Sequence, residues 1–583
     1  MLFQRLARCF SVAICLSLIA ACASQNATPA PPTELANKPT AEQKRADKDS
    51  PNQNPTKTPR PAATATPIIT GPHFEQVGGL QLKPPTEGRH ADLTLYNDLI
   101  LLGMQPSSCQ LENRITLIDV SDPRQPEVAG YSPVVKNVSL EDMDVARIGE
   151  QDIAIVGMQP CSGETKPGIQ ILDITDPSKP VELARFATTL GVHELDLTVN
   201  SSGQALALLA APTNNVFGST PMAEHRAELW IVDLSTPSKP TKLSRWGIDQ
   251  KLDWQMLDYA DRARGNFPGI FLHSVRASSN SQRAYLSYWD AGVIILDIQD
   301  PAQPVYLGQT PYPALAEGDA HSVVDWNDGQ FLALNNEDFS NGQAKISHPA
   351  LAEPAYAHAL PFGEKLDQPL SAEFVALEQA CDPKADYPDF AGRFVLIEIA
   401  GCSIERKFIV AQTGKAAGLL LYANKPYQEL PFGDDVDLIT EFNLPMYLLS
   451  STTAAALLSQ PEAKATIEQY FDGGGAIQFF DLSDPSKPVE IGRYNTPNSI
   501  DAKRATNPTV HNSEVQGQYL YASWYRDGLR MLDISDPSQP QEVAAWPNGN
   551  SPSVNLWGVQ VRDQYVYVSD LSYGLYVLEF HAE

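Results

Sequence analysis

Five of the ten histidines in this chain recur at the same place relative to a repeated phrase, where each opens a short predicted strand. These residues are His90, His193, His273, His321 and His511. Imidazole is a common ligand of Zn, Cu, Fe and Ni, so five imidazoles that converge on one axis could bind a transition metal. Glu337 and Asp338 follow a neighbouring predicted strand and could join the ligands or orient a ring. The candidate cofactor is therefore one transition metal ion (Cu, Zn or Fe).

The same alignment has a second interpretation that needs no ligand. A histidine inherited with each duplicated repeat could hydrogen-bond the backbone of the neighbouring repeat and serve the fold alone. The two other repeats carry Glu141 or Asp142 and Trp557 at this place. No G-x-S-x-G or HExxH motif is present, so no catalytic role is assigned and a binding protein is expected rather than an enzyme. Both interpretations of the histidines stay open.

A ten-residue phrase that recurs six times defines the elements that must position these histidines. Its copies begin at Leu117, Ile171, Ile231, Ile295, Phe479 and Met531. Each copy, such as ILDITDPSKP, is an apolar run, an Asp, an apolar residue and a polar turn closed by Pro. Other short apolar runs around each copy predict four strands per repeat, which is the pattern of a β-propeller blade.

These repeats resemble the LVIVD family, which is named for the apolar strand before the Asp. The resemblance implies a propeller and does not imply one activity. The aligned first strands begin near His90, Glu141, His193, His273, His321, His511 and Trp557. The last repeat lacks a fourth strand, and residues 74–78 resemble the missing one. We therefore predict an all-β, seven-bladed β-propeller that is closed by an N-terminal strand.

The fifth repeat is interrupted between its second and third strands by about 140 residues, too many for a structureless loop. An α/β pattern fills this gap, with strands predicted over 394–399 and 417–422 and a helix over 404–413. Together with Cys402, Lys407 and the Leu444-Pro445 pair, it resembles a protease-associated (PA) domain. The resemblance implies a lid or a protein-interaction module without catalytic groups.

The N-terminus indicates export. Arg5 and Arg8 precede an apolar stretch that ends at Cys22, which resembles a bacterial lipoprotein signal with Cys22 as the lipidated residue. An ordinary secretory signal that is cleaved nearby is the alternative. Residues 23–70 are rich in Pro, Thr and Ala and predict a disordered tether. The expected location is the bacterial cell envelope, outside the cytoplasm, with a lipid anchor in a membrane.

Four cysteines remain after the signal and Cys22 are set aside. They are Cys109, Cys161, Cys381 and Cys402. In an oxidising compartment the economical pairing, one of three, joins Cys109 to Cys161 and Cys381 to Cys402. Four free thiols are the alternative, and no CxxC spacing suggests that they bind a metal.

Charge and domain order complete the prediction. A net charge of −28 argues against a nucleic-acid partner. The expected divisions are a signal (1–22), a tether (23–70), a first propeller part (71–343), the inserted PA domain (344–472) and a second propeller part (473–583). The predicted function is a binding scaffold whose PA domain and propeller face take protein or peptide partners. The alternative is a metal-dependent enzyme, oxidase- or hydrolase-like, that uses a histidine cluster in the central channel.

Overall fold

The computed structural model describes most of the chain from residue 71 onwards. The described segments are residues 71–83, 88–106, 112–160, 165–212, 228–248, 271–311, 318–338, 343–360, 363–422, 443–471, 473–501, 509–547 and 553–582. The expected signal and tether lie outside these residues, and so do Cys22, Cys109 and Cys161. No helix within the described segments is long and apolar enough to cross a bilayer.

Seven antiparallel sheets with one common strand order make up the repeats in the described part of the chain. In one of them, β17 (Leu272–Ala277), β18 (Arg283–Tyr288), β19 (Gly292–Asp297) and β20 (Val305–Gln309) are neighbours in sequence and in space. β18 and β19 are almost wholly buried because the adjacent sheets pack on both of their faces. The last residue of β19, Asp297, accepts the N–H of Gln299 at 2.8 Å and caps the turn, as the repeated phrase predicts.

The other six sheets repeat this plan. Their strands are β2 (Gly88–Tyr96), β3 (Leu99–Pro106), β5 (Thr116–Asp119) and β6 (Glu127–Tyr131); β9 (Met143–Ile148), β10 (Gln151–Pro160), β11 (Gly168–Asp173) and β12 (Val181–Ala187); β13 (Leu195–Val199), β14 (Ala205–Ala210), β15 (Leu229–Asp233) and β16 (Thr241–Trp246); β21 (Ala320–Trp326), β22 (Phe331–Asn336), β32 (Ala476–Asp481) and β33 (Val489–Tyr494); β34 (Ser513–Gln516), β35 (Tyr519–Trp524), β36 (Gly528–Asp533) and β37 (Gln541–Trp546); β38 (Leu556–Arg562), β39 (Tyr565–Asp570), β40 (Gly574–His581) and β1 (His73–Gln81). Short strands β8 (Val138–Ser139), β4 (Glu112–Asn113) and β7 (Val135–Lys136) lie beside them. This all-β arrangement fits a β-propeller.

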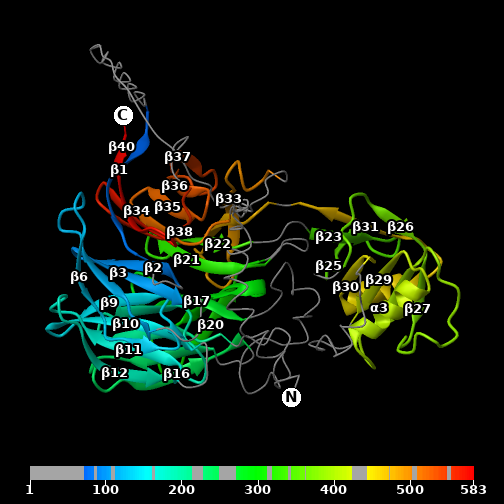
Figure 1. The fold of residues 1–583 in the computed structure, drawn as a ribbon, viewed down its shortest axis with the longest axis horizontal. Coiled ribbons are helices and arrows are strands. Elements are labelled where there is room, and N and C mark those ends of the chain that lie inside the picture. The colour runs from blue at the N-terminus through cyan, green and yellow to red at the C-terminus, as the bar shows by residue number, and fades with distance from the viewer. Residues whose placement is uncertain are drawn as a thin grey trace, which may run out of the picture.

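The first described strand completes the last sheet. β1 pairs antiparallel with β40, from His73 opposite His581 to Gln81 opposite Gly574. Figure 1 shows these two strands side by side at the C-terminus. Phe74 is buried in the apolar core that this sheet forms with the preceding one. The prediction that an N-terminal strand near residues 74–78 supplies the missing fourth strand is therefore confirmed.

An insertion interrupts the sheet of β21 without disturbing its pairing. β22 and β32 are adjacent and in continuous register, with Asn336 opposite Ala476. The residues between them form a separate α/β unit, drawn on the right of Figure 1. Its elements are β23 (Gln343–Ser347), β24 (Ala355–Tyr356), β25 (His358–Ala359), β26 (Leu370–Ala372), β27 (Phe374–Leu377), β28 (Phe394–Glu398), α3 (Ile404–Thr413), β29 (Gly418–Tyr422), β30 (Met446–Leu449), α4 (Ser451–Ser459) and β31 (Ala465–Tyr470).

The inserted unit has its own interior. Strands β27 to β30 pair in parallel, and β25 closes one edge of this mixed sheet. One apolar core contains Val395 and Phe408 of α3, and a second contains Phe394 and Leu457 of α4. Because successive residues of a strand point to opposite faces, the two cores lie on opposite faces of the sheet. A disulfide joins Cys381 to Cys402, the residue before the N-cap of α3.

Candidate functional site

The first strand of several sheets carries a bulge at the residue that the repeats align. The pairing register of β17 with β18 shifts between Leu272 and Ser274, so His273 is the extra residue. The register of β21 with β22 shifts in the same way around His321. A bulge bends its strand and re-aims a side chain, and bulges are common next to functional sites. These two bulges therefore turn the histidines away from the regular alternation of their strands.

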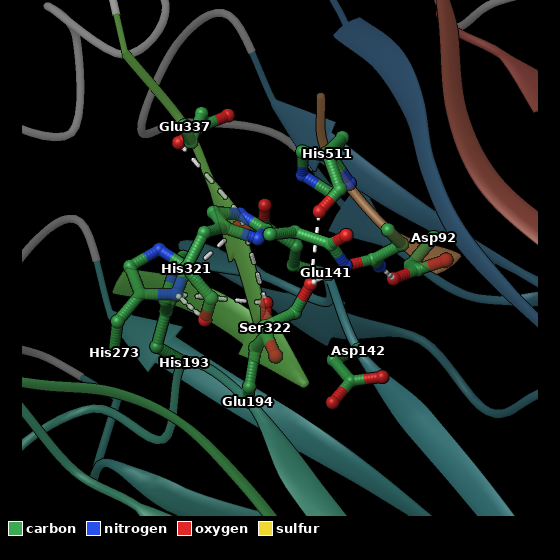
Figure 2. Close-up of polar contacts among 12 residues, drawn as sticks. Asp92, Glu141, Asp142, His193, Glu194, His273, His321, Ser322, Glu337 and His511 are labelled. Atoms are coloured by element: carbon green, nitrogen blue, oxygen red, sulfur yellow. Dashed lines mark hydrogen bonds and ion pairs between the residues drawn. The ribbon is translucent and has the colours of Figure 1, made fainter. Parts of the chain in front are cut away.

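Four of the five aligned histidines form one buried row. The Nε2 atoms of His193 and His273 are 2.9 Å apart. The ring centroids of His273 and His321 are separated by 4.2 Å, and those of His321 and His511 by 4.3 Å. His193 is 7% exposed and the other three are 2% exposed. The alignment of the repeats thus identified side chains that lie together in space (Figure 2).

His90 occupies the equivalent place on β2 but stands apart from this row. It is buried, and its backbone N–H donates to the carbonyl of Leu571 at 3.1 Å. Burial lowers the pKa of His90, so the neutral ring is favoured. Within the described segments, His90 belongs to neither of the three-residue groups whose ligand atoms could share one metal ion.

In His273 and His511, one ring nitrogen contacts the backbone of the next sheet. His273 Nδ1 lies 3.1 Å from the carbonyl oxygen of His321, and His511 Nδ1 lies 3.1 Å from that of Trp557. A carbonyl can only accept, so each Nδ1 carries a proton and donates it. A neutral imidazole has one N–H, which leaves Nε2 of both rings with a lone pair. The expected hydrogen bond from an aligned histidine to the neighbouring backbone is confirmed for these two residues.

Three glutamates flank the row. Glu194 Oε1 is 3.7 Å from His273 Nδ1 and 3.9 Å from His321 Nε2, and Glu337 Oε2 is 3.7 Å from His321 Nε2. Glu141 Oε2 approaches His193 Nδ1 to 3.5 Å. In Figure 2, Glu337 and Glu194 approach the histidines from opposite sides. All three carboxylates are buried, so the row combines nitrogen and oxygen donors.

The two acidic residues singled out after β22 have different roles. The hydroxyl of Tyr525 donates to Glu337 Oε1, so this carboxylate is held beside the histidine row as predicted. Tyr525 has φ of 39°, a left-handed conformation that costs a bulky residue energy and marks a constrained turn. Asp338 is buried nearby, and its backbone N–H donates to Thr509 Oγ1 at 2.8 Å. Asp338 is not a member of either possible ligand group in the described residues.

Glu194 was not singled out in the sequence. It directly follows His193, and strict strand alternation would place the two side chains on opposite faces. Regular pairing of β13 begins only at Leu195, so both residues precede the alternating part of the strand. The available signal was its position, because Asp142 in the preceding repeat follows Glu141 at the same place.

Burial favours the neutral forms of the histidines and glutamates of the row. It lowers the pKa of His193 to about 4 and lowers those of His273, His321 and His511 well below the usual value. It also raises the pKa of Glu141 to about 7 and that of Glu337 well above its usual range. The histidines are therefore neutral and present lone pairs.

Carboxylates further along the first strands act as cross-links. Asp142 accepts the N–H of Leu195 at 2.8 Å, and Asp144 accepts that of Leu197 at 2.8 Å. Asp196 likewise accepts the N–H of Ala277 at 3.0 Å. Each bond joins the first strands of two neighbouring sheets, which share no ladder of their own. These aspartates thus serve the ring of sheets, with both oxygens of Asp142 and Asp144 already committed to backbone N–H groups.

Arg276 provides a cation beside these cross-links. Its Nη1 lies 3.4 Å from Asp196 Oδ1. Burial opposes its charge, but the carboxylates of Asp142 and Asp196 outweigh burial and raise its pKa. The positive charge of Arg276 is therefore shared among the structural aspartates of β9 and β13.

Two overlapping groups in the described segments have ligand atoms that all lie within 4.8 Å of one another. The first contains His193, Glu194 and His273, and the second contains His273, His321 and Glu337. Each group has two imidazoles and one carboxylate, a donor set that proteins use for first-row transition metals.

Comparison with known proteins agrees with the repeat assignment. LVIVD repeats are found in five segments, residues 151–188, 222–246, 282–310, 472–496 and 510–546. These segments contain five of the six copies of the phrase, and the copy that begins at Leu117 lies outside them. LVIVD repeats in a chain of antiparallel sheets fit a repeat β-propeller, a fold associated with protein interaction.

No curated protein matches this sequence. Among solved structures, the computationally designed protein Ika8 is similar over 86% of this chain and 100% of its own, with 8% identity and a TM-score of 0.36. A likeness of this size identifies neither a function nor a site.

Proposed function

We propose that this protein is an exported, membrane-anchored β-propeller that acts as a binding scaffold, with the inserted unit as its recognition module. The observation that carries the proposal is the independence of the insertion. It has two apolar cores and a disulfide of its own, and it leaves β22 and β32 paired in register. A unit added in this way costs the host sheet little and presents new surface to a partner.

The host is a seven-bladed propeller in this proposal. Support comes from the seven repeat sheets of the described residues, six with four strands and one with five, and from β1, which supplies the fourth strand of the last sheet. A ring of packed sheets leaves only short, protected sheet edges, so it is a rigid base for a projecting arm.

The inserted unit is a PA-type domain in this proposal. Its parallel strands β27 to β30, the helix α3 and the cysteine that precedes it follow the order that suggested the resemblance. Lys407 of α3 is buried, and its ammonium donates to the carbonyls of Gln379 and Ala400 at 2.7 and 2.8 Å. This lysine therefore holds the start of the helix and is not available for catalysis.

The anchor is Cys22, lipidated after signal removal, with residues 23–70 as the tether. Mass spectrometry of the mature N-terminus from bacterial membranes should find a diacylglyceryl group on Cys22. Cys22→Ser should release the chain from the membrane fraction, because one polar N-terminus has no bilayer affinity comparable to that of several acyl chains. A wild-type N-terminus that starts elsewhere and carries no lipid would contradict the anchor.

Partner binding is tested by removing the insertion from the full chain. Asn336 and Ala476 are directly opposed, so a short Gly-rich turn can replace residues 344–472 and leave the sheet closed. The deletion protein should keep its strand circular dichroism and lose at least one protein that crosslinks to the wild type on cells. An unchanged set of crosslinked proteins, or none for either protein, would refute the recognition role.

A second candidate function is a metal-dependent enzyme. The row favours it, because in the described residues His193, Glu194 and His273 form one group with ligand atoms within 4.8 Å of one another, and His273, His321 and Glu337 form a second. This candidate requires that the row bind a metal ion, and metal binding can be tested independently of partner binding.

A further inference from the structure

We propose that the histidine row is a mononuclear transition-metal site, with His193 and His273 as nitrogen ligands and Glu194, His321 and Glu337 completing the donor set. This inference goes beyond the scaffold role and does not depend on it. It rests on the lone pairs of two facing nitrogens, on the supports behind the rings and on the charge of the site.

The closest contact in the row is between Nε2 of His193 and Nε2 of His273. His273 Nδ1 donates to the carbonyl of His321, so its Nε2 carries a lone pair. The oxygens nearest to His193 Nδ1 are Gln159 Oε1 at 3.2 Å and Glu141 Oε2 at 3.5 Å, and the tautomer with its proton on Nδ1 donates to them. The two Nε2 atoms, 2.9 Å apart, then present lone pairs to each other. In this tautomer a cation between the two nitrogens stabilises the pair, whereas the other neutral tautomer of His193 makes an ordinary hydrogen bond to His273.

The spacing suits a metal ion. Ligand nitrogens about 2.0–2.1 Å from one ion, at a right angle to each other, are separated by about 2.9 Å. The alternative is one proton between the two nitrogens, in an ordinary hydrogen bond between two neutral rings. A metal ion that is also bound by the carboxylates is neutralised where it sits.

The rings are supported in the way that metal ligands are. A histidine ligand almost always donates its second ring N–H to a carbonyl or a carboxylate, which fixes the tautomer and the orientation. His273 uses the backbone of the next repeat for this purpose, and His193 uses Gln159 and Glu141. The repeat-consensus hydrogen bond and the metal site are therefore compatible, because they use opposite nitrogens of the same ring.

The shared ligand His273 and the charge of the carboxylates both indicate a single divalent ion. The two possible ligand groups share His273, whose single free nitrogen can bind one ion at a time. When they bind a divalent ion, the carboxylates of Glu194 and Glu337 together supply the two negative charges that balance it. The nearby cation, Arg276, is already paired with Asp196. Two imidazoles with a carboxylate match the donor set of non-heme Fe(II) sites, and Zn(II) accepts the same ligands.

The test uses the purified full-length protein, stripped with a chelator and titrated with Co(II) as a spectroscopic probe. The wild type should bind one Co(II) per chain, with visible d–d absorption, and should gain thermal stability from it. His193→Gln and His273→Gln should each weaken Co(II) binding at least about tenfold. His90→Gln is the matched control, a buried histidine at the same repeat position, and should bind like the wild type.

Circular dichroism of each stripped variant separates loss of the site from loss of the fold. If His273→Gln does not fold, Glu194→Gln and Glu337→Gln take its place and should alter the Co(II) absorption spectrum. Wild-type protein that binds no stoichiometric Co(II) would overturn the proposal. Unimpaired binding by His193→Gln and His273→Gln would also overturn it and assign the facing nitrogens to a shared proton.

Discussion

At the scale of single residues, the hydrogen bond to a neighbouring backbone and the proposed metal site use opposite nitrogens of the His273 ring. Nδ1 of His273 and of His511 bonds a neighbouring carbonyl, as inheritance by duplication predicts. Nε2 of His273 faces His193 Nε2 across 2.9 Å, as a shared ligand requires. The alignment of repeats could predict the row because equivalent residues of a propeller lie at the same distance from its central axis. It could not predict Glu194, because that residue joins the site through irregular backbone before β13.

His358 of the inserted unit is a contrasting buried histidine with a measurable consequence. Among the described residues its Nδ1 has no hydrogen-bond partner, and burial lowers its pKa to about 4. An unfolded histidine titrates near 6.5, so the unfolded chain binds the additional proton between about pH 6.5 and 4. The folded state therefore keeps this contribution above pH 6.5 and loses up to about 3 kcal/mol as the pH falls towards 4.

Urea unfolding of the wild type and of His358→Gln, compared at each pH from 5 to 7.5, measures this effect. The stability difference between the two proteins should shrink as the pH falls. A difference that stays constant over this range would rule out a depressed pKa for His358.

At the scale of elements, bulges orient the histidines of the row, and the strand β1 from the N-terminal side completes the last sheet. The sequence predicted the four strands of each repeat closely, since the apolar runs and Pro-closed turns are local signals. The bulges at His273 and His321 are not local signals, because they depend on how β17 and β21 pair with their neighbours. The insertion was visible as a gap in the repeat, and its helix over 404–413 coincides with α3.

The borrowed strand β1 should be essential for the last sheet. Phe74 is buried in a core with Tyr521 and Tyr576, so Phe74→Ala should destabilise the protein by about 3–5 kcal/mol. Loss of β1 would also leave β40 as an open edge that promotes aggregation. Thermal unfolding and hydrogen exchange in β40 measure both effects. Glu75→Ala, at the adjacent exposed position of β1, is the control and should change stability by less than about 0.5 kcal/mol.

At the scale of the whole molecule, the described part of the chain combines packed antiparallel sheets with one separate α/β unit (Figure 1). Each sheet packs on its neighbours through apolar residues, and Asp142, Asp144 and Asp196 add bonds between first strands near the centre. The centre of the proposed propeller is where equivalent residues of all repeats meet. A site there can be assembled from residues far apart in sequence, which is why His193 and Glu337 could be linked only through the repeat alignment.

The most direct test of the metal site is anomalous diffraction from crystals of the full chain loaded with Co(II), recorded on both sides of the cobalt edge. The account predicts one anomalous peak per chain, about 2.0–2.2 Å from Nε2 of His193 and Nε2 of His273, with a carboxylate oxygen of Glu194 or Glu337 as a further ligand. A map without a peak between these two nitrogens, or with the cobalt bound at other residues, would contradict it.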